Sequence, residues 1–308
     1  MSDSPALLHI RALRVRVPAL LPARDLSLVL LICLAWAGNF LASAAALQHF
    51  PPFVFTALRL IVVLAFLVRF LQPVPPALRK RLVVVALCSG ALHFGFNFWA
   101  IAVAGDISSV AISLQSYIPM TALLAWWLLG ERPTRSTAAG IGVAFLGVAV
   151  LGFDPLVLDA PLALGLSLIA AATLALGTTL LRTLPGLHTF QIQAWSAAIS
   201  VPPLLLVAAL TEPVSLSLLT DARWQDWAGV LYSALAASLV GHGLLYGLLQ
   251  RHPVAQVTPM LLLTPVFAVT LGVLFWGDRP GPRLLFGGLM VLGGVLIVAV
   301  RGAVRARQ

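Results

Sequence analysis

The sequence predicts an all-α membrane protein in which ten transmembrane helices form two inverted five-helix repeats. Three observations support this fold class. Of 308 residues, 60% are hydrophobic and only 9% are charged, with a mean hydropathy of +1.02, whereas soluble domains carry roughly a quarter charged residues. Long uncharged stretches recur along the chain, as bilayer spans of about 20 residues require. One phrase of sequence also occurs twice.

Prolines and other helix-breaking residues divide the apolar stretches into spans, because proline lacks an amide donor and ends helices. The predicted spans are residues 26–47, 53–71, 82–104, 108–129, 136–153, 162–182, 189–210, 227–249, 254–275 and 283–300. They divide the chain into a basic N-terminal segment (1–25), a first repeat (26–153), a second repeat (160–300) and a basic tail (301–308).

Basic residues predict the orientation, because cytoplasmic loops retain Lys and Arg. With the N-terminus inside, most of the 19 Lys and Arg residues fall in cytoplasmic segments, and most of the 10 acids fall on the outer side. We therefore expect a multi-pass inner (plasma) membrane protein with both termini in the cytoplasm. Topology and contact with anionic lipid account for the net charge of +9, so we expect no nucleic-acid partner.

The repeated phrase is YIPMTALLAWWLLGERP at 117–133 and LTPVFAVTLGVLFWGDRP at 263–280. Aligning Pro133 with Pro280 pairs Glu131 with Asp278, Arg132 with Arg279, Gly140 with Gly287 and Gly147 with Gly294. Five is an odd number, so the second copy enters the membrane from the opposite side. Two inverted copies can close one side while opening the other, with a site near mid-membrane. The alternative is that the duplication records only ancestry.

The first half contains, in order, Trp36-Ala37-Gly38-Asn39-Phe40, Pro51-Pro52, Leu58-Arg59, the 117–133 phrase, Gly140 and Gly147. This order resembles the EamA-type family of the drug/metabolite transporter superfamily, over about residues 26 to 300. Two further stretches, 241–246 and 261–265, resemble the branch that exports amino acids and derivatives such as cysteine and O-acetylserine. Leu176 departs from the pattern, since this family often has Trp near that position. The resemblance implies an exporter that works by alternating access.

Polar side chains inside spans are expected to line a cavity or to join helices, because they are costly in lipid. Ser89, His93 and Asn97 recur at four-residue spacing, as do Ser238, His242 and Tyr246, so each triplet shares a helix face. Ser89 and Ser238 are expected to bond their own backbone carbonyls. The candidate substrate-binding residues are Trp36, Asn39, Arg59, His93, Asn97, Gln115, Tyr117, Trp195, His242, Tyr246 and Thr264.

Arg59 is a charged residue about 10 Å into the second predicted helix, at 1.5 Å per residue. It either attracts a substrate carboxylate or bonds helix-end carbonyls, Gln48 or His49. No Asp or Glu lies inside a predicted span, so proton coupling would have to use His93 or His242. We therefore favour facilitated exchange or efflux. A substrate ammonium would rely on carbonyls, Asn, Gln or aromatic faces.

Other functions are less well supported. Cys33 and Cys88 are far apart in sequence, which argues against a disulfide framework and a metal site, and we expect no cofactor and no catalytic residues. An intramembrane enzyme would need a nucleophile with a base, or a metal cluster. The sequence and the resemblance predict a transporter that exports small polar metabolites, with amino acids such as threonine, or compounds like cysteine and O-acetylserine, as substrates. The alternatives are a carrier of drugs, sugar phosphates or nucleotide sugars, and a passive channel.

The fifth and tenth predicted helices carry small residues that permit close helix approach. They are Gly140 and Ala144 on one helix, and Gly287, Gly288, Gly293 and Gly294 on the other. We expect these residues to serve packing, either within one subunit or across a homodimer.

Overall fold

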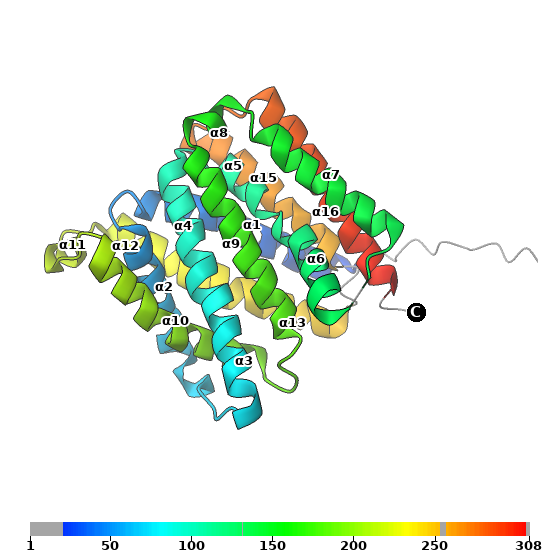
Figure 1. Ribbon diagram of the computed structural model, residues 1–308. Coiled ribbons are helices and arrows are strands. Elements are labelled where there is room, and N and C mark those ends of the chain that lie inside the picture. Colours follow the sequence, from blue (N-terminus) through cyan, green and yellow to red (C-terminus); the bar gives the residue numbers. More distant parts are fainter. Residues whose placement is uncertain (1–20, 131, 253–256, 306–308) are drawn as a thin grey trace, which may run out of the picture.

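The computed structural model describes residues 21–130, 132–252 and 257–305, and every regular element among them is helical (Figure 1). The α-helices are α1 (Ala23–Ala46), α2 (Pro52–Leu67), α3 (Pro76–Ala86), α4 (His93–Ala104), α5 (Ser108–Leu114), α6 (Tyr117–Leu129), α7 (Arg135–Leu151), α8 (Pro155–Asp159), α9 (Pro161–Leu181), α10 (Thr189–Thr211), α11 (Leu216–Thr220), α12 (Trp224–Leu231), α13 (His242–Arg251), α15 (Leu263–Leu271) and α16 (Pro282–Arg305). Most of the predicted basic N-terminal segment, Glu131 and the end of the tail lie outside the described residues.

Among the described residues, eight helical stretches are long and apolar enough to cross a membrane. They are Ala23–Ala46, Pro52–Phe70, Pro76–Ala104, Ser108–Leu129, Pro161–Leu181, Thr189–Thr211, Trp224–Leu245 and Pro282–Ala299. Each coincides with a predicted span. Two shorter apolar stretches, Arg135–Leu151 and Met260–Trp276, lie at the fifth and ninth predicted spans.

Several spans contain irregular turns. The third is one continuous helical stretch in which a π-helical segment, Leu87–Leu92, joins α3 to α4, and a longer π segment, Tyr232–Gly241, precedes α13. The fourth span is interrupted between α5 and α6, one turn before Pro119, which has no amide hydrogen to donate back. The ninth has a 3₁₀ segment, Thr258–Leu262, before Pro265. The duplicated phrase therefore begins at a helix break in both copies.

The helices α7 and α16 lie side by side at one edge of the bundle (Figure 1). Their backbones touch because glycines face each other. A Cβ atom on Gly147 would lie 2.6 Å from the carbonyl oxygen of Gly287, and one on Gly140 would lie 2.9 Å from that of Gly294. The close approach lies within one chain, so a homodimer through these helices would have to use their exposed faces.

Hydrogen bonds also join α2 to α10 near both ends. The backbone amides of Phe53 and Val54, in the first turn of α2, donate to the Glu212 carboxylate at 2.8 and 2.9 Å. A carboxylate at a helix N-terminus satisfies otherwise unpaired amides. At the other end, the Gln191 side chain and the Trp195 indole donate to the Gln72 carbonyl at 3.2 and 2.9 Å. These bonds connect residues from the two predicted repeats.

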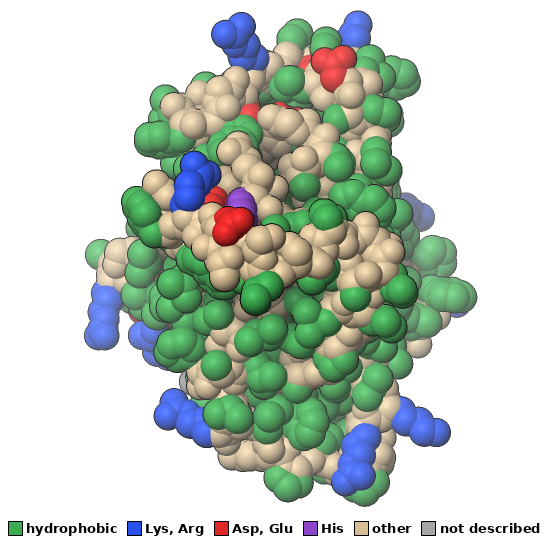
Figure 2. Space-filling model, turned by 90° about the vertical axis from the view of Figure 1, so that its left-hand side faces the viewer, with side chains coloured by type: hydrophobic (Ala, Val, Ile, Leu, Met, Phe, Trp, Pro, Cys, Tyr) green, Lys and Arg blue, Asp and Glu red, His purple; other side chains and the backbone are tan. Residues whose placement is uncertain are grey.

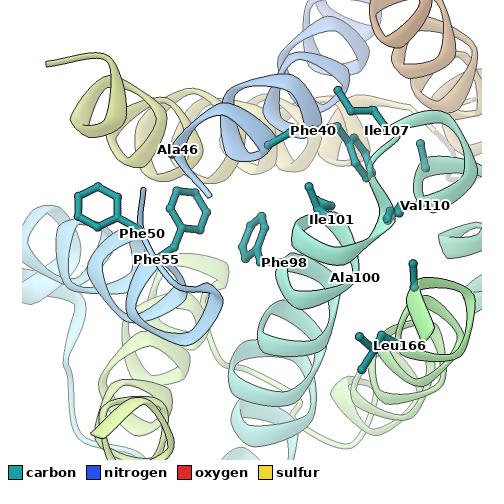
Figure 3. Close-up of a cluster of buried hydrophobic side chains, with 14 of the residues drawn as sticks. Phe40, Ala46, Phe50, Phe55, Phe98, Ala100, Ile101, Ile107, Val110 and Leu166 are labelled. Atoms are coloured by element: carbon teal, nitrogen blue, oxygen red, sulfur yellow. The ribbon is translucent and has the colours of Figure 1, made fainter. Parts of the chain in front are cut away.

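The main hydrophobic core lies where α1, α2, α4 and α5 meet (Figure 3). Phe55 and Phe98 form its centre, with their rings edge to face at 4.8 Å between centroids. The outside of the bundle is also apolar. Hydrophobic side chains cover most of the middle and lower part of the face in Figure 2, whereas Lys and Arg lie mainly at its upper and lower edges and along its left side, and acidic side chains lie in its upper half. This distribution suits a helix bundle surrounded by lipid.

Three buried aspartates cap helices at one end of the bundle. Asp278, which ends the second copy of the phrase, accepts bonds from the amides of Ile107 and Ser108 at the start of α5. Asp154 accepts one from Leu284 in α16 at 2.9 Å, and Asp106 accepts one from Ser109 in α5 at 2.6 Å. The acid of the repeated phrase therefore holds together segments that are far apart in the chain.

We predict that Gly147→Ala destabilises the protein, because the added methyl group overlaps the backbone of α16. Overpacking of this kind costs about 1–3 kcal/mol. The matched control is Gly142→Ala on the same helix, where a Cβ would have no neighbour within 4 Å. In thermal unfolding of the purified protein, Gly147→Ala should melt at a clearly lower temperature than Gly142→Ala. Equal melting temperatures would contradict the tight α7–α16 contact.

The pKa of Asp106 predicts a pH effect on stability. Burial raises this pKa from 3.8 to about 6, against the lowering effect of hydrogen bonds from Ser109, and the charges of Asp278 and Asp154 raise it further. Between these two pH values the folded state binds more protons than the unfolded state, so this group's contribution to stability is lost as pH rises. Compared with the wild type, Asp106→Asn should therefore gain in melting temperature from pH 4 to pH 7. A constant difference would contradict the raised pKa.

Candidate functional site

The candidate site is built around Arg59, whose side chain is only 2% exposed although it lies in the middle of α2. The helix begins at Pro52, so Arg59 is two turns from the nearer end. One terminal nitrogen of its guanidinium donates to the hydroxyl of Ser238. The guanidinium also lies over the rings of Phe94 and Phe98 from α4, at 4.0 and 5.2 Å from their centroids. Contacts with Gln48 or His49, one of the two sequence-based alternatives, are not what holds Arg59.

The charge of Arg59 is incompletely satisfied. Its Nε and Nη1 atoms are buried without a hydrogen-bond partner, and the ion pairs among the described residues join Asp25 or Asp226 to residues other than Arg59. A buried donor without a partner costs about 1–3 kcal/mol, and more when it is charged. Stacking on aromatic faces offsets part of this cost. The arrangement leaves two donor nitrogens for an acceptor that the described residues do not supply.

Two histidines lie close enough to Arg59 to interact with its charge. Nδ1 of His93 is 3.0 Å from the Ala170 carbonyl of α9, and Nδ1 of His242 is 3.1 Å from the carbonyl of Ser238. A carbonyl oxygen only accepts, so Nδ1 carries the hydrogen in both rings. In the neutral form of His93, Nε2 is therefore an acceptor. The Ser238 residue contacts Arg59 through its side chain and His242 through its backbone.

Trp36 of α1 lies beside this group. Its ring centroid is 5.3 Å from that of His242, and its indole nitrogen donates to the Ala237 carbonyl at 2.9 Å. Gly241 makes this contact possible, because a Cβ there would lie 2.5 Å from the indole nitrogen. Asn39, one turn further along α1, accepts a bond of 3.4 Å from Ser43. Helices from both predicted repeats thus meet at Arg59.

The π segments change the local geometry in a way that four-residue spacing does not predict. Each ends directly before a site histidine, His93 in one case and His242 in the other. In the second segment the Ser238 hydroxyl donates to the carbonyl of Ser233, five residues back, at 2.9 Å. Ser89 points toward Gly177 of α9, where it limits the space for any larger residue. Such π segments are frequent at functional sites.

The remaining predicted residues have different surroundings. Asn97 is 4% exposed, one turn after His93 on α4, and its side-chain oxygen has no partner. Gln115 and Tyr117 flank the break between α5 and α6, and Thr264 is buried at the start of α15. Trp195 packs with Val74 and Leu184 and bonds a loop carbonyl, so it has none of the neighbours of Arg59. The side chain of Tyr246 lies outside the described residues.

The sequence analysis missed Ser238, Phe94 and Phe98 as site residues. Ser238 was expected to bond only its own backbone, and it does so, but the same hydroxyl also accepts from Arg59. Its position four residues before His242 was the available signal. In the described part of the chain, no group of three or more His, Cys, Asp or Glu side chains is placed to hold a metal ion.

We predict that Ser238→Ala destabilises the protein by roughly 1–3 kcal/mol, because it removes the hydrogen-bond acceptor of a buried guanidinium. Ser167→Ala is the matched control, since this serine is equally buried but bonds only the Ala163 carbonyl of its own helix at 2.8 Å. Both variants would be compared with the wild type by thermal unfolding in the same detergent. A loss no larger for Ser238→Ala than for Ser167→Ala would show that Ser238 does not support Arg59.

The chain matches the EamA-like transporter family over residues 24–153 and 161–300. It is 28% identical over 284 residues to a probable amino-acid metabolite efflux pump of Salmonella typhimurium, covering 89% of this chain and 94% of that protein. It is 30% identical to the protein of the same description in Escherichia coli (strain K12), covering 89% of this chain and 92% of that protein.

A probable terminal-alkyne amino-acid exporter of Streptantibioticus cattleyicolor is 26% identical, with 74% of this chain and 77% of that protein covered. A solved crystal structure matches with a TM-score of 0.61 at 18% identity, over 92% of this chain and 99% of that chain. At this identity the likeness shows the fold alone. Together with the apolar helices, these matches identify a multi-span membrane protein of a transporter family rather than an enzyme family. The chain belongs to the EamA-like transporter family.

Proposed function

We propose that the protein exports small carboxylate-bearing metabolites, amino acids or their derivatives, with Arg59 binding the carboxylate. The observation that carries this proposal is the buried guanidinium with two unpaired donors. A carboxylate offers two oxygens in the geometry that guanidinium donors match. The amino-acid exporters among the relatives support the same substrate class.

We further propose ten spans arranged as two inverted repeats, 26–153 and 160–300, with both termini in the cytoplasm of an inner-membrane protein. The two ranges matched by the family, 24–153 and 161–300, support the boundaries. Arg135–Leu151 and Met260–Trp276 have the length of short spans, within the range of about 17–25 residues that crosses a bilayer. In this orientation the capping aspartates lie on the outer side, and Lys80 and Arg81 in the first half of α3 lie on the inner side.

Alternating access is the mechanism that fits this arrangement. The cluster around Arg59 joins helices of both repeats, as expected for a site at a repeat interface. The helix irregularities next to Pro119 and Pro265 lie at corresponding positions of the two repeats, where the helices can bend. Arg59, His93 and Asn97 are 2%, 5% and 4% exposed, so the site is closed to water in this conformation. A closed site favours a carrier over a passive channel, which would need a continuous open path.

A sugar-phosphate or nucleotide-sugar carrier is less well supported. Phosphate groups carry about two negative charges near neutral pH, and sites for them gather several basic side chains. Arg59 is the one Lys or Arg in the interior of a predicted span, whereas Arg69, Arg182 and Arg283 lie at span ends. One guanidinium matches one carboxylate.

We predict that Arg59→Gln weakens transport of carboxylates selectively. Purified wild-type and variant protein would be placed in liposomes loaded with unlabelled amino acids, and uptake of labelled serine, threonine or cysteine would be followed. The wild type should show saturable uptake accelerated by internal substrate. Relative to the wild type, the variant should raise the apparent substrate constant of the amino acid at least tenfold compared with that of its amide, because only the carboxylate loses its charge partner.

The control is the melting temperature of Arg59→Gln, which establishes that the variant is folded. Equal losses for the acid and its amide would favour a purely structural role of Arg59. Linear, unsaturable flux in the wild type would contradict the carrier mechanism and support a channel.

A further inference from the structure

We propose that the Arg59 site selects monocarboxylates whose nitrogen carries no positive charge, such as N-acylated amino acids and hydroxy acids, over zwitterionic amino acids. This inference rests on the proposed function for the position of the site and specifies the charge state of the substrate. The juxtaposition that supports it is a buried cation near neutral hydrogen-bond acceptors on α4, with no acidic side chain among the described residues that contact it.

The charges around Arg59 determine which substrates the site attracts. The described side chains in contact with Arg59 are Ser238, Phe94 and Phe98, and the imidazoles of His93 and His242 lie within range of its charge. Neither type of neighbour can supply a negative charge. The predicted spans contain no Asp or Glu. The electrostatic potential at the site is therefore positive, and an ammonium group entering it finds no counter-charge.

Arg59 interacts differently with a zwitterionic amino acid and with its N-acylated form. A carboxylate against the guanidinium is attracted strongly, because the site is buried and the effective dielectric constant is low. In a zwitterion the ammonium lies only a few ångströms further away, and Coulomb energy falls only as the inverse of distance. Its repulsion by Arg59 cancels a large part of the attraction. Acylation of the nitrogen removes this repulsion and leaves the carboxylate contact intact.

The hydrogen-bond acceptors on α4 also favour a neutral nitrogen in the substrate. The Asn97 side-chain oxygen is buried and has no partner, and Nε2 of neutral His93 is an acceptor because Nδ1 donates to Ala170. These acceptors suit one amide N–H or one hydroxyl group. An ammonium has three donors and loses more hydration free energy on burial than a neutral amide does. Hydrogen bonding and charge thus favour the same class of substrate.

The test uses four derivatives of serine that separate the two charges. They are N-acetylserine (carboxylate only), serine (both charges), N-acetylserinamide (neither charge) and serinamide (ammonium only), and the matching four derivatives of leucine control for side-chain size. Binding to the purified wild-type protein would be measured by the ligand-induced rise in melting temperature, and transport by counterflow in liposomes. We expect N-acetylserine to bind at least tenfold more tightly than serine, and serinamide to bind most weakly.

The variant Arg59→Gln should remove the preference for a carboxylate, so that N-acetylserine and N-acetylserinamide bind alike. Tighter or equal binding of the free amino acid in both series would overturn the proposed selectivity, while saturable exchange of that amino acid would leave the export function standing. The expected order of binding without accelerated exchange of any compound would support the selectivity and contradict export. Failure of all eight compounds to bind or exchange would overturn both.

Discussion

The buried charge of Arg59 is the constraint on which the rest of the site depends. A charged side chain at this depth is costly in a membrane protein unless it is paired or faces a polar cavity. Here the chain supplies one hydroxyl and two aromatic faces, which is less than a guanidinium with five N–H donors requires. The free-energy cost of burying the remaining donors is offset by stabilising contacts elsewhere in the bundle. The unpaired donors leave the site able to bind an anionic ligand.

Contacts away from the site supply that stability. The glycine faces of α7 and α16 bring two backbones into contact, and dispersion contacts of this kind drive helix association inside lipid, where the hydrophobic effect does not act between helices. The Glu212 and Asp278 carboxylates cap helix N-termini from distant parts of the chain. These bonds use backbone amides that would otherwise be unpaired. The helices around Arg59 can therefore be interrupted by π and 3₁₀ turns while the bundle as a whole stays ordered.

Much of the fold follows from the sequence because lipid restricts the options. Charge-free stretches of sufficient length must be helical, so eight of the predicted spans coincide with long apolar helices among the described residues. The spacing of Gly140, Gly147, Gly287 and Gly294 likewise predicted close packing, since nothing else explains small residues at these intervals. Both inferences rest on constraints that act locally along the chain.

The site was harder to predict because its geometry depends on contacts between distant segments. Arg59, His93 and His242 could be chosen as polar residues in apolar spans, but their interaction could not be read from spacing. The π segments shift the helix faces, so regular periodicity misplaces Ser89. Trp195 is an aromatic residue with a polar N–H in a predicted span, as a substrate-binding residue can be, but its indole donates to the Gln72 carbonyl away from Arg59. Ser238 holds Arg59 whereas Ser167 bonds only its own helix, and the four-residue spacing to His242 is the sequence feature that sets Ser238 apart.

The same unpaired charge accounts for the kind of transport that we propose. In alternating access the carrier changes conformation both with and without substrate. The empty carrier must rearrange its helices around an uncompensated cation, whose unmet hydrogen bonds and charge resist transfer through a less polar transition state. The loaded carrier moves a compensated pair instead. Substrate on the opposite side therefore speeds the return step, which favours exchange over uncoupled leakage without requiring a protonatable carboxylate inside the membrane.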